Sequence, residues 1–207
     1  MEEKSIGNKR EASPEIIRKE AIALAESVGW AKLTVRALAK RIGYQPPILY
    51  QYFKSKDHLL EAIINEGFEQ LIKNMRTAAF EASTPQAALI AAARARFDFA
   101  IENSSLHSLM FAAGGPCWQR QATFQGMCGA EELISGLLQE ITHRTDSCSD
   151  LVTNFVALIK GYTYFATEMP QEQACRNFFP NKTPGEALSE AMTRFIYSIQ
   201  NCIHEQT

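Results

Sequence analysis

Cationic side chains are concentrated in the first 60 residues of the 207-residue chain, beside hydroxyl and amide groups that can bind a polyanion. This part holds eleven Lys and Arg against seven Asp and Glu, a net charge of +4, whereas the other 147 residues hold ten against sixteen, a net charge of −6. Arg36, Lys40 and Arg41 share one side of a predicted short helix whose other side is apolar. A basic N-terminal part on an acidic body is typical of a nucleic-acid-binding module joined to a part that does not bind nucleic acid.

The sequence offers no arrangement typical of catalysis or of metal binding. The four histidines are scattered over positions 58, 107, 143 and 204. There is no glycine-rich phosphate loop, no nucleophile spaced from a base and no evident carboxylate pair. We therefore expect neither an enzyme nor a bound cofactor or metal.

The cysteines are expected to be reduced. All five lie in the second half of the chain, and no two form a C-x-x-C motif, so a disulfide framework or a zinc site is not expected. The main interpretation is buried small apolar side chains or surface thiols, and a redox or thiol-sensing role for one of them is the alternative. They are Cys117, Cys128, Cys148, Cys175 and Cys202.

Residues that can cap or begin a helix recur in the first 60 positions, each before an amphipathic pattern. These starts are Ser13 with Pro14, Thr34, Pro47 and Ser55. Gly29 and Gly43 are expected to end the first two helices. The residue before a proline is disfavoured in the helical region, so Pro46 is expected to stay outside a third helix that begins at Pro47.

The rest of the chain keeps a helical period and shows no persuasive strand pattern. The fourth pattern holds its phase from residue 56 to the Ser83-Thr84-Pro85 break, so a long helix should join the N-terminal part to the body. Further helices are expected near 85–103, 105–112, 119–143, 149–168 and 184–204, with loops at 114–116 and 169–184. The predicted fold is all-α, with a mobile arm (1–13), a three-helix helix-turn-helix domain (14–60) and a helical-bundle ligand-binding and dimerisation body (61–207).

No membrane role is expected. The sequence has no run of about 18 apolar residues that could span a bilayer. Residues 1–13 mix both charges and lack the apolar stretch of a secretory signal. A cytoplasmic location is therefore expected.

Residues 33–60 have the order of a helix-turn-helix unit, in which one short helix braces a second that enters the major groove. After the Gly29 turn, this stretch resembles the DNA-binding domain of the TetR family of repressors. The matching positions are Leu33-Thr34-Val35, Leu38-Ala39, Ile42-Gly43 and Leu49-Tyr50-x-Tyr52-Phe53-x-Ser55-Lys56-Asp57-x-Leu59-Leu60. The resemblance covers about residues 14–62 and implies a transcriptional repressor that binds double-stranded operator DNA.

The resemblance implies phosphate contacts from Thr34, Tyr50 and Lys54. Hydroxyl and ammonium donors suit this role because they fix the register of a protein on the DNA backbone. Arg36 and Lys56 are further cationic candidates for DNA contacts. The Tyr52 side chain has two interpretations: its hydroxyl lies at the edge of the DNA groove, or its ring packs in the core. The apolar positions of this segment are expected in the core, namely Leu38, Ala39, Ile42, Leu49 and Phe53.

Base recognition is expected to depend on few polar groups. The family usually has a small hydroxyl residue at the start of the recognition helix, whereas this chain has Tyr44, Gln45, Pro46 and Pro47. Gln45 is the main candidate, with Tyr44 and Gln51 at the edges, and the two prolines offer only apolar contact to a thymine methyl. Phosphate contacts should therefore dominate the affinity.

The resemblance further implies a homodimer on a palindromic site, formed by the last two long helices. One short helix reads few base pairs, so two-fold symmetry would double the contact. The stripes expected at that interface are Leu151, Phe155, Leu158, Ile159 and Tyr162 near 149–168, and Leu188, Met192, Phe195, Ile196 and Ile199 near 185–203. A purely intramolecular core is the alternative interpretation of these stripes.

A pocket for a small-molecule inducer, apolar or aromatic, is expected among the middle helices. Its predicted lining is Phe97, Phe111, Trp118, Phe124, Met127 and Phe165, with Cys128 as a further candidate. Taken one by one, each of these residues is more typical of plain core than of a pocket. Arg94, Arg96 and His107 can orient a polar group of the ligand or take satisfied surface roles. Ligand binding is expected to tilt the long helix that begins at residue 57 and so to change the spacing of the two DNA-binding domains.

A second function remains compatible with these features. A DNA-bound scaffold or an activator, whose body binds protein partners without a small-molecule inducer, has the same sequence pattern. Thermal stabilisation of the protein that rises with the concentration of a small hydrophobic compound would indicate a ligand pocket and so separate the two hypotheses.

Overall fold

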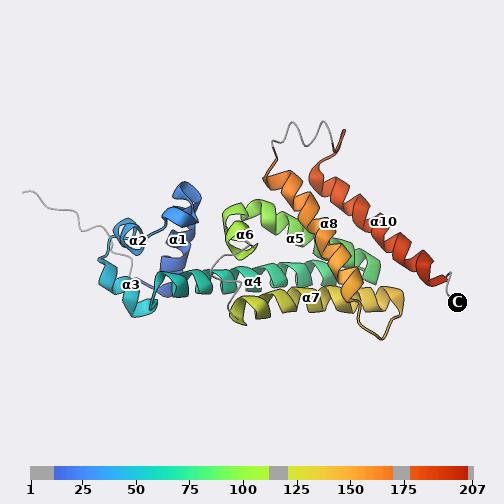
Figure 1. Ribbon diagram of the computed structural model, residues 1–207, viewed down its shortest axis with the longest axis horizontal. Coiled ribbons are helices and arrows are strands. Elements are labelled where there is room, and N and C mark those ends of the chain that lie inside the picture. The colour runs from blue at the N-terminus through green and yellow to red at the C-terminus, as the bar shows by residue number, and fades with distance from the viewer. Residues whose placement is uncertain (1–11, 112–120, 170–177, 205–207) are drawn as a thin grey trace, which may run out of the picture.

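The structure is a computed structural model that describes residues 12–111, 121–169 and 178–204. Within these ranges every regular element is a helix, as predicted (Figure 1). A small N-terminal group of helices lies at one end of the molecule and a larger helical body at the other. The proposed arm falls mostly on residues 1–11, which are outside the described residues.

The first two helices of the N-terminal group have the predicted starts and stops. The side chains of Ser13 and Thr34 cap the first two helices by accepting hydrogen bonds from the amides of Ile16 (3.3 Å) and Ala37 (3.1 Å). Gly29 and Gly43 follow these helices with φ of +83° and +77°, a conformation that glycine adopts without strain. The elements are α1 (Pro14–Val28), the short 3-10 helix η1 (Trp30–Lys32), α2 (Val35–Arg41) and α3 (Pro46–Tyr52).

The start of α3 corrects the sequence prediction, because the helix includes Pro46 and does not wait for Pro47. Gln45 is the N-cap residue, and its carbonyl accepts a hydrogen bond from the Ile48 amide at 3.1 Å. The two prolines occupy the first two helical positions, whose amides have no partner within a helix in any case. No hydrogen bond is therefore lost there, and the fixed φ of Pro46 already suits the helix.

A long helix, α4 (Lys56–Phe80), connects the N-terminal group to the body, as predicted. The Ser55 hydroxyl caps it by accepting a hydrogen bond from the His58 amide at 3.1 Å. Figure 1 shows α4 running from α3 along the length of the body. Its buried face includes Leu60, Phe68 and Met75, so this one helix contributes to the core along most of its length.

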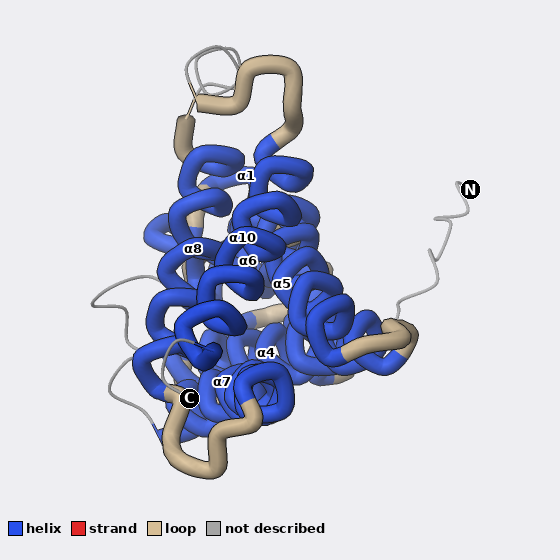
Figure 2. The backbone as a smooth tube through the Cα atoms, turned by 90° about the vertical axis from the view of Figure 1, so that its right-hand side faces the viewer, coloured by secondary structure: helices blue, strands red, loops and turns tan. Residues whose placement is uncertain are grey.

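The body packs around α5. This helix contacts α4 and α7 on one side and α8 and α10 on the other, an arrangement visible in Figures 1 and 2. The helix α6 closes the end of the body next to α1. The body helices are α5 (Pro85–Glu102), α6 (Ser104–Phe111), α7 (Gln121–Thr142), α8 (Ser149–Thr167) and α10 (Pro184–His204). All five match the predicted stretches to within a few residues.

The core divides the stripes that were expected to form a dimer interface. On α8, Phe155 and Ile159 are buried within the monomer, whereas Leu158 and Tyr162 are only half-buried. On α10, Leu188, Met192, Ile196 and Ile199 are buried and Phe195 is half-buried. The buried residues of each stripe thus belong to the core of the monomer, as the intramolecular interpretation holds. The half-buried residues of each stripe remain partly exposed to solvent.

Candidate DNA interface and ligand pocket

The first candidate site is a hollow between α2 and the start of α3. Its rim carries the hydroxyl of Thr34 and the cationic side chains of Arg36 and Lys40, all exposed. Arg36 and Lys40 are four residues apart and so share one face of α2. The lining comprises Thr34, Arg36, Ala37, Lys40, Gly43, Tyr44, Gln45 and Pro46. This surface combines donors for phosphate with a polar group at the tip of a short helix.

Gln45 is the exposed N-cap residue of α3. It lies in extended backbone (φ −90°, ψ 148°) immediately before α3, and its side chain makes no capping hydrogen bond. The side chain is exposed at the end of the helix that faces the hollow. An amide in this position can donate to and accept from a base edge, whereas Pro46 and Pro47 contribute no backbone donor.

The remaining expected DNA contacts fall into two groups. Tyr50, Gln51 and Lys54 are exposed, with Tyr50 at 53% of its maximal area. Tyr52 is instead tied to the chain, because its hydroxyl donates to the Ala12 carbonyl at 2.7 Å. Lys56 is half-buried, and its ammonium donates to the Trp30 carbonyl at 3.4 Å.

Lys40 belongs with the expected contacts although the sequence prediction did not include it. It lines the same hollow as Thr34 and Gln45. The signal was present in the sequence, since a cation four residues after Arg36 on a short helix must lie beside it. Arg41, the next cation, points elsewhere and pairs with Glu20 of α1 at 2.8 Å.

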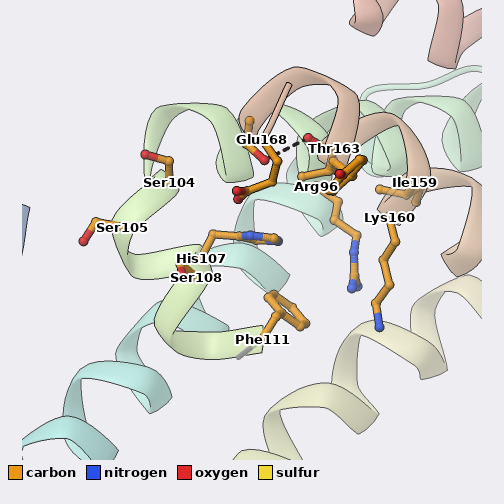
Figure 3. A pocket seen from close by; sticks show the side chains of 12 residues that line it. Arg96, Ser104, Ser105, His107, Ser108, Phe111, Ile159, Lys160, Thr163 and Glu168 are labelled. Carbon is orange, nitrogen blue, oxygen red and sulfur yellow. Dashed lines mark hydrogen bonds between the residues drawn. The ribbon is translucent and has the colours of Figure 1, made fainter. Parts of the chain in front are cut away.

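The second candidate site is a cavity of about 530 Å³ between α5, α6 and α8 (Figure 3). Arg96 enters it from α5, His107 and Phe111 from α6, and Lys160 and Thr163 from α8. The volume is sufficient for a drug-sized ligand. Its lining mixes apolar walls with cationic, hydroxyl and carboxylate groups, and is therefore more polar than the predicted aromatic pocket.

The predicted pocket residues are not gathered in one place. Of the three whose side chains the structure describes, Phe111 lines this cavity, whereas Phe97 and Phe165 line separate hollows. The other three, Trp118, Phe124 and Met127, lie outside the described side chains. Arg96 and His107, the polar candidates, both line the cavity, while Arg94 forms an ion pair with Asp98 at 2.9 Å.

Burial lowers the pKa of two side chains in the cavity, those of Arg96 and His107. Only 6% of Arg96 is exposed, and this desolvation lowers the pKa of its guanidinium to about 10, partly opposed by the charge of Glu131. Burial likewise lowers the pKa of His107 to about 4, helped by the nearby charges of Arg96 and Lys160. At pH 7 Arg96 is therefore a cation and His107 is a neutral imidazole.

Aromatic contacts hold these two nitrogen groups in place. The Arg96 guanidinium lies over the Phe111 ring, 5.1 Å from its centre. The His107 ring lies 4.6 Å from the same ring, measured between centroids. Phe111 also packs edge-on against the buried Phe68 of α4, so the cavity wall is continuous with the core.

A direct hydrogen bond joins the N-terminal group to the wall of this cavity. The indole N–H of Trp30 donates to the Ser105 carbonyl of α6 at 2.8 Å. Ser105 is also one of the residues that line the cavity. An ion pair between Arg18 of α1 and Glu66 of α4 adds a second link from α1 to the body.

Other kinds of site are not evident in the described part of the chain. No group of three or more His, Cys, Asp and Glu residues in that part is placed to hold a metal ion. Among the same residues, no helix is both long and apolar enough to span a membrane. Cys148 is buried and Cys128 is half-buried, both as free thiols, and the side chains of the other three cysteines lie outside the described residues.

Comparison with known families assigns the N-terminal segment. The profile of the family described as bacterial regulatory proteins, tetR family, matches residues 17–63. The class C tetracycline repressor protein of Escherichia coli is 45% identical over 49 residues, which are 24% of this chain and 22% of that repressor. The chain thus matches about a fifth of the length of this curated relative.

Comparison with solved structures extends the likeness to the whole fold. A protein of unknown function from Rhodococcus sp. RHA1 aligns over 91% of this chain and 96% of its own, with a TM-score of 0.76 and 19% identity. The transcriptional regulator FadR of Bacillus subtilis, in complex with stearoyl-CoA, aligns over 90% and 98%, with a TM-score of 0.71 and 18% identity. The TetR family transcriptional regulator PfmR of Thermus thermophilus aligns over 90% and 96%, with a TM-score of 0.67 and 18% identity. At this level of identity the likeness establishes the fold.

Proposed function

Because residues 17–63 form the N-terminal domain of the tetR family of bacterial regulatory proteins, we propose that this protein is a dimeric repressor that binds operator DNA and responds to a small molecule. The observation that carries the proposal is the exposed surface shared by α2 and α3. There Thr34, Arg36 and Lys40 provide phosphate donors beside the free amide of Gln45. Such a repressor acts in the cytoplasm, where the DNA is.

Binding would rely mainly on phosphates. Within residues 45–52, Gln45 at the start of α3 and the exposed Gln51 in its last turn are the residues with side-chain amides, and both prolines lack a backbone donor. The exposed hydroxyl of Tyr50 and ammonium of Lys54 suit phosphate contacts. Tyr52 and Lys56 would instead hold the domain together, since both donate hydrogen bonds to backbone carbonyls within it.

Dimerisation would use α8 and α10. An apolar groove runs between these helices, lined by the half-buried Leu158, Tyr162 and Phe195 together with Phe165 and Phe179. A partner's equivalent groove could cover this surface, which is the geometry of an isologous interface. Two-fold pairing would place two copies of α3 on a palindromic site.

Ligand binding would act through α6. The cavity and the hydrogen bond from Trp30 meet at Ser105, so displacement of α6 would be transmitted to the DNA-binding domain as well as along α4. The FadR structure, which shares the fold, contains stearoyl-CoA, which supports ligand binding in a body of this kind. The same cavity favours a ligand-responsive regulator over a scaffold that has no small-molecule ligand.

The test is duplex binding by the full-length protein, measured by fluorescence anisotropy against salt concentration. Arg36→Ala and Lys40→Ala should each weaken binding to specific and scrambled duplexes alike and reduce the salt slope by about one. Gln45→Ala should weaken operator binding by about 1–3 kcal/mol and spare scrambled DNA. Lys73→Ala, an exposed cation on α4 in the body, is the matched control and should change neither.

The outcomes separate the parts of this proposal. Failure of the protein to retain any duplex at low salt would refute DNA binding. Equal losses of Gln45→Ala on both duplexes would remove Gln45 from base recognition while leaving the phosphate contacts intact.

A further inference from the structure

The cavity between α5, α6 and α8 contains a buried cation that pairs with no carboxylate of the described residues. Arg96 is 94% buried, since its exposed fraction is 6%, and among the described residues it forms no ion pair. Its close contact is with the Phe111 ring. A buried guanidinium is costly unless a counter-charge or hydrogen-bond acceptors satisfy it. Figure 3 shows its guanidinium extending into the cavity.

A second cation converges on the same space. Lys160 extends from α8 beside Arg96, and the two side chains run in the same direction, with the Arg96 guanidinium over the Phe111 ring (Figure 3). The two charges also act together on His107, as expected if they lie near the same point. A guanidinium offers a planar fork of donors that matches a carboxylate or a phosphate, and an ammonium adds a point charge.

We propose that this cavity binds an organic oxyanion, with its carboxylate or phosphate held by Arg96 and Lys160 and its apolar part against Phe111 and Ile159. The inference rests on the proposed ligand-responsive function and specifies the chemical class of the ligand. It adds an anionic headgroup to the predicted apolar or aromatic compound, because an uncharged ligand would leave Arg96 without a counter-charge. The neutral His107 can donate one further hydrogen bond to the anion.

The acidic residues nearby define where the anion can sit. Glu168 lines the cavity from the C-terminal end of α8, on the side of Ser104, away from the ends of Arg96 and Lys160 (Figure 3). Glu131 of α7 acts on Arg96 through its charge and, with Glu132, lines a neighbouring hollow that Lys160 lines as well. With two cations and one carboxylate lining it, the cavity has a net positive charge, concentrated near Phe111.

The experiment is calorimetric titration of the full-length protein at pH 7 with matched acid and amide pairs. The pairs are benzoate with benzamide, 2-naphthoate with 2-naphthamide, and octanoate with octanamide, and phenyl phosphate tests the second oxyanion. At least one anion should bind about tenfold or more tightly than its neutral partner, because a charge-assisted hydrogen bond is lost in the amide. The comparison of carboxylates with phenyl phosphate identifies the preferred headgroup.

Variants locate the binding site. Lys160→Gln, at an exposed position, should weaken the best anion several-fold, and Arg96→Gln should remove most of the preference for the anion over the amide. Arg96→Lys keeps the charge but loses the planar fork of donors, so it should reduce this preference in part. Arg94→Gln is the matched control, because Arg94 lies on the same helix but pairs with Asp98 outside the cavity, and it should bind like the wild type. Should Arg96→Gln fail to fold, Lys160→Gln and Arg96→Lys still test the proposal.

Equal binding of every acid and its amide, or no binding by any anion of the panel, would overturn the proposal. Retention of the full anion preference in Lys160→Gln and Arg96→Lys would overturn it as well. None of these measurements involves DNA, so loss of duplex binding and loss of anion binding can be told apart.

Discussion

At the scale of single residues, similar side chains have different roles because their surroundings differ. Gln45 and Thr34 are both N-cap residues, but only the Thr34 hydroxyl accepts a capping hydrogen bond, from the Ala37 amide. The Gln45 amide is left available to a base. Arg94 and Arg96 are two positions apart on α5, yet one is a surface ion pair and the other a buried cation in a cavity.

His107 gives a prediction about pH. Its folded-state pKa of about 4 lies below the ordinary value of 6.5, so the unfolded chain binds more protons between these values. The contribution of neutral His107 to stability is therefore complete above about pH 6.5 and is lost as the pH falls toward about 4. As the pH is lowered from about 6.5 to about 4, protonation of His107 should reduce the free energy of unfolding by up to about 3 kcal/mol, at roughly 1.4 kcal/mol per pKa unit.

Urea denaturation at several pH values measures this contribution. His107→Gln should reduce the loss of stability between pH 6.5 and 4, whereas His143→Asn, which replaces an exposed histidine with positive φ, should retain the wild-type dependence. Equal pH dependence in wild type and His107→Gln would show that His107 does not titrate in this way.

At the scale of elements, α4 and α6 both connect the DNA-binding domain to the body. The helix α4 does so by continuity of the chain, and α6 does so through the Trp30 indole on the Ser105 carbonyl. The cavity lies against α6, so its occupancy bears directly on the second connection. As a helix of eight residues, α6 is easier to displace than α4, which is buried along much of its 25 residues.

Trp30→Phe tests the second connection. Phenylalanine keeps an aromatic ring but removes the N–H donor, so the free energy of unfolding should fall by about 1 kcal/mol. Amide hydrogen exchange should become faster in residues 14–55, with little change in α5 and α8. Tyr50→Phe is the control, since it removes an exposed hydroxyl of the same domain and should leave exchange unchanged. Unaltered protection of residues 14–55 in Trp30→Phe would argue against a mechanical link at this point.

At the scale of the whole molecule, the α8 and α10 groove is the surface that the proposed dimer would use. Its apolar lining is half-buried in the monomer, whereas the facing sides of both helices already belong to the core. Covering this groove would remove further apolar area from water. The DNA-binding surface lies at the far end of the molecule, so pairing at the groove leaves α2 and α3 accessible.

Leu158→Asp tests the interface by analytical ultracentrifugation. The wild type should sediment as a dimer and the variant as a monomer, because a carboxylate in an apolar interface loses its hydration without gaining a partner. Operator affinity should fall with the dimer, since each monomer reads only a half-site. Phe80→Asp, at a position 91% exposed at the end of α4, should remain dimeric. Thermal unfolding of both variants checks that they are folded, and a monomeric wild type would contradict pairing at this groove.

The sequence by itself determined the helices and the DNA-binding segment. Capping hydroxyls at Ser13, Thr34 and Ser55 and the glycines after the first two helices act over three or four residues, so their effect is readable without the fold. The sequence prediction placed the start of α3 one residue late. A residue before proline disfavours the helical region, but this preference is outweighed at the first two helical positions, where proline is well tolerated.

The ligand cavity depended on tertiary structure. Arg96, Phe111 and Lys160 belong to three helices, and no spacing in the sequence shows that their side chains meet. Aromatic residues in a bundle serve core and pocket alike, which is why Phe97 and Phe165 were expected at a site that they do not line. Which face of α8 is buried within the monomer also depends on α5 and α10. The sequence shows which residues of α8 form an apolar stripe, but it does not show which helix covers that stripe.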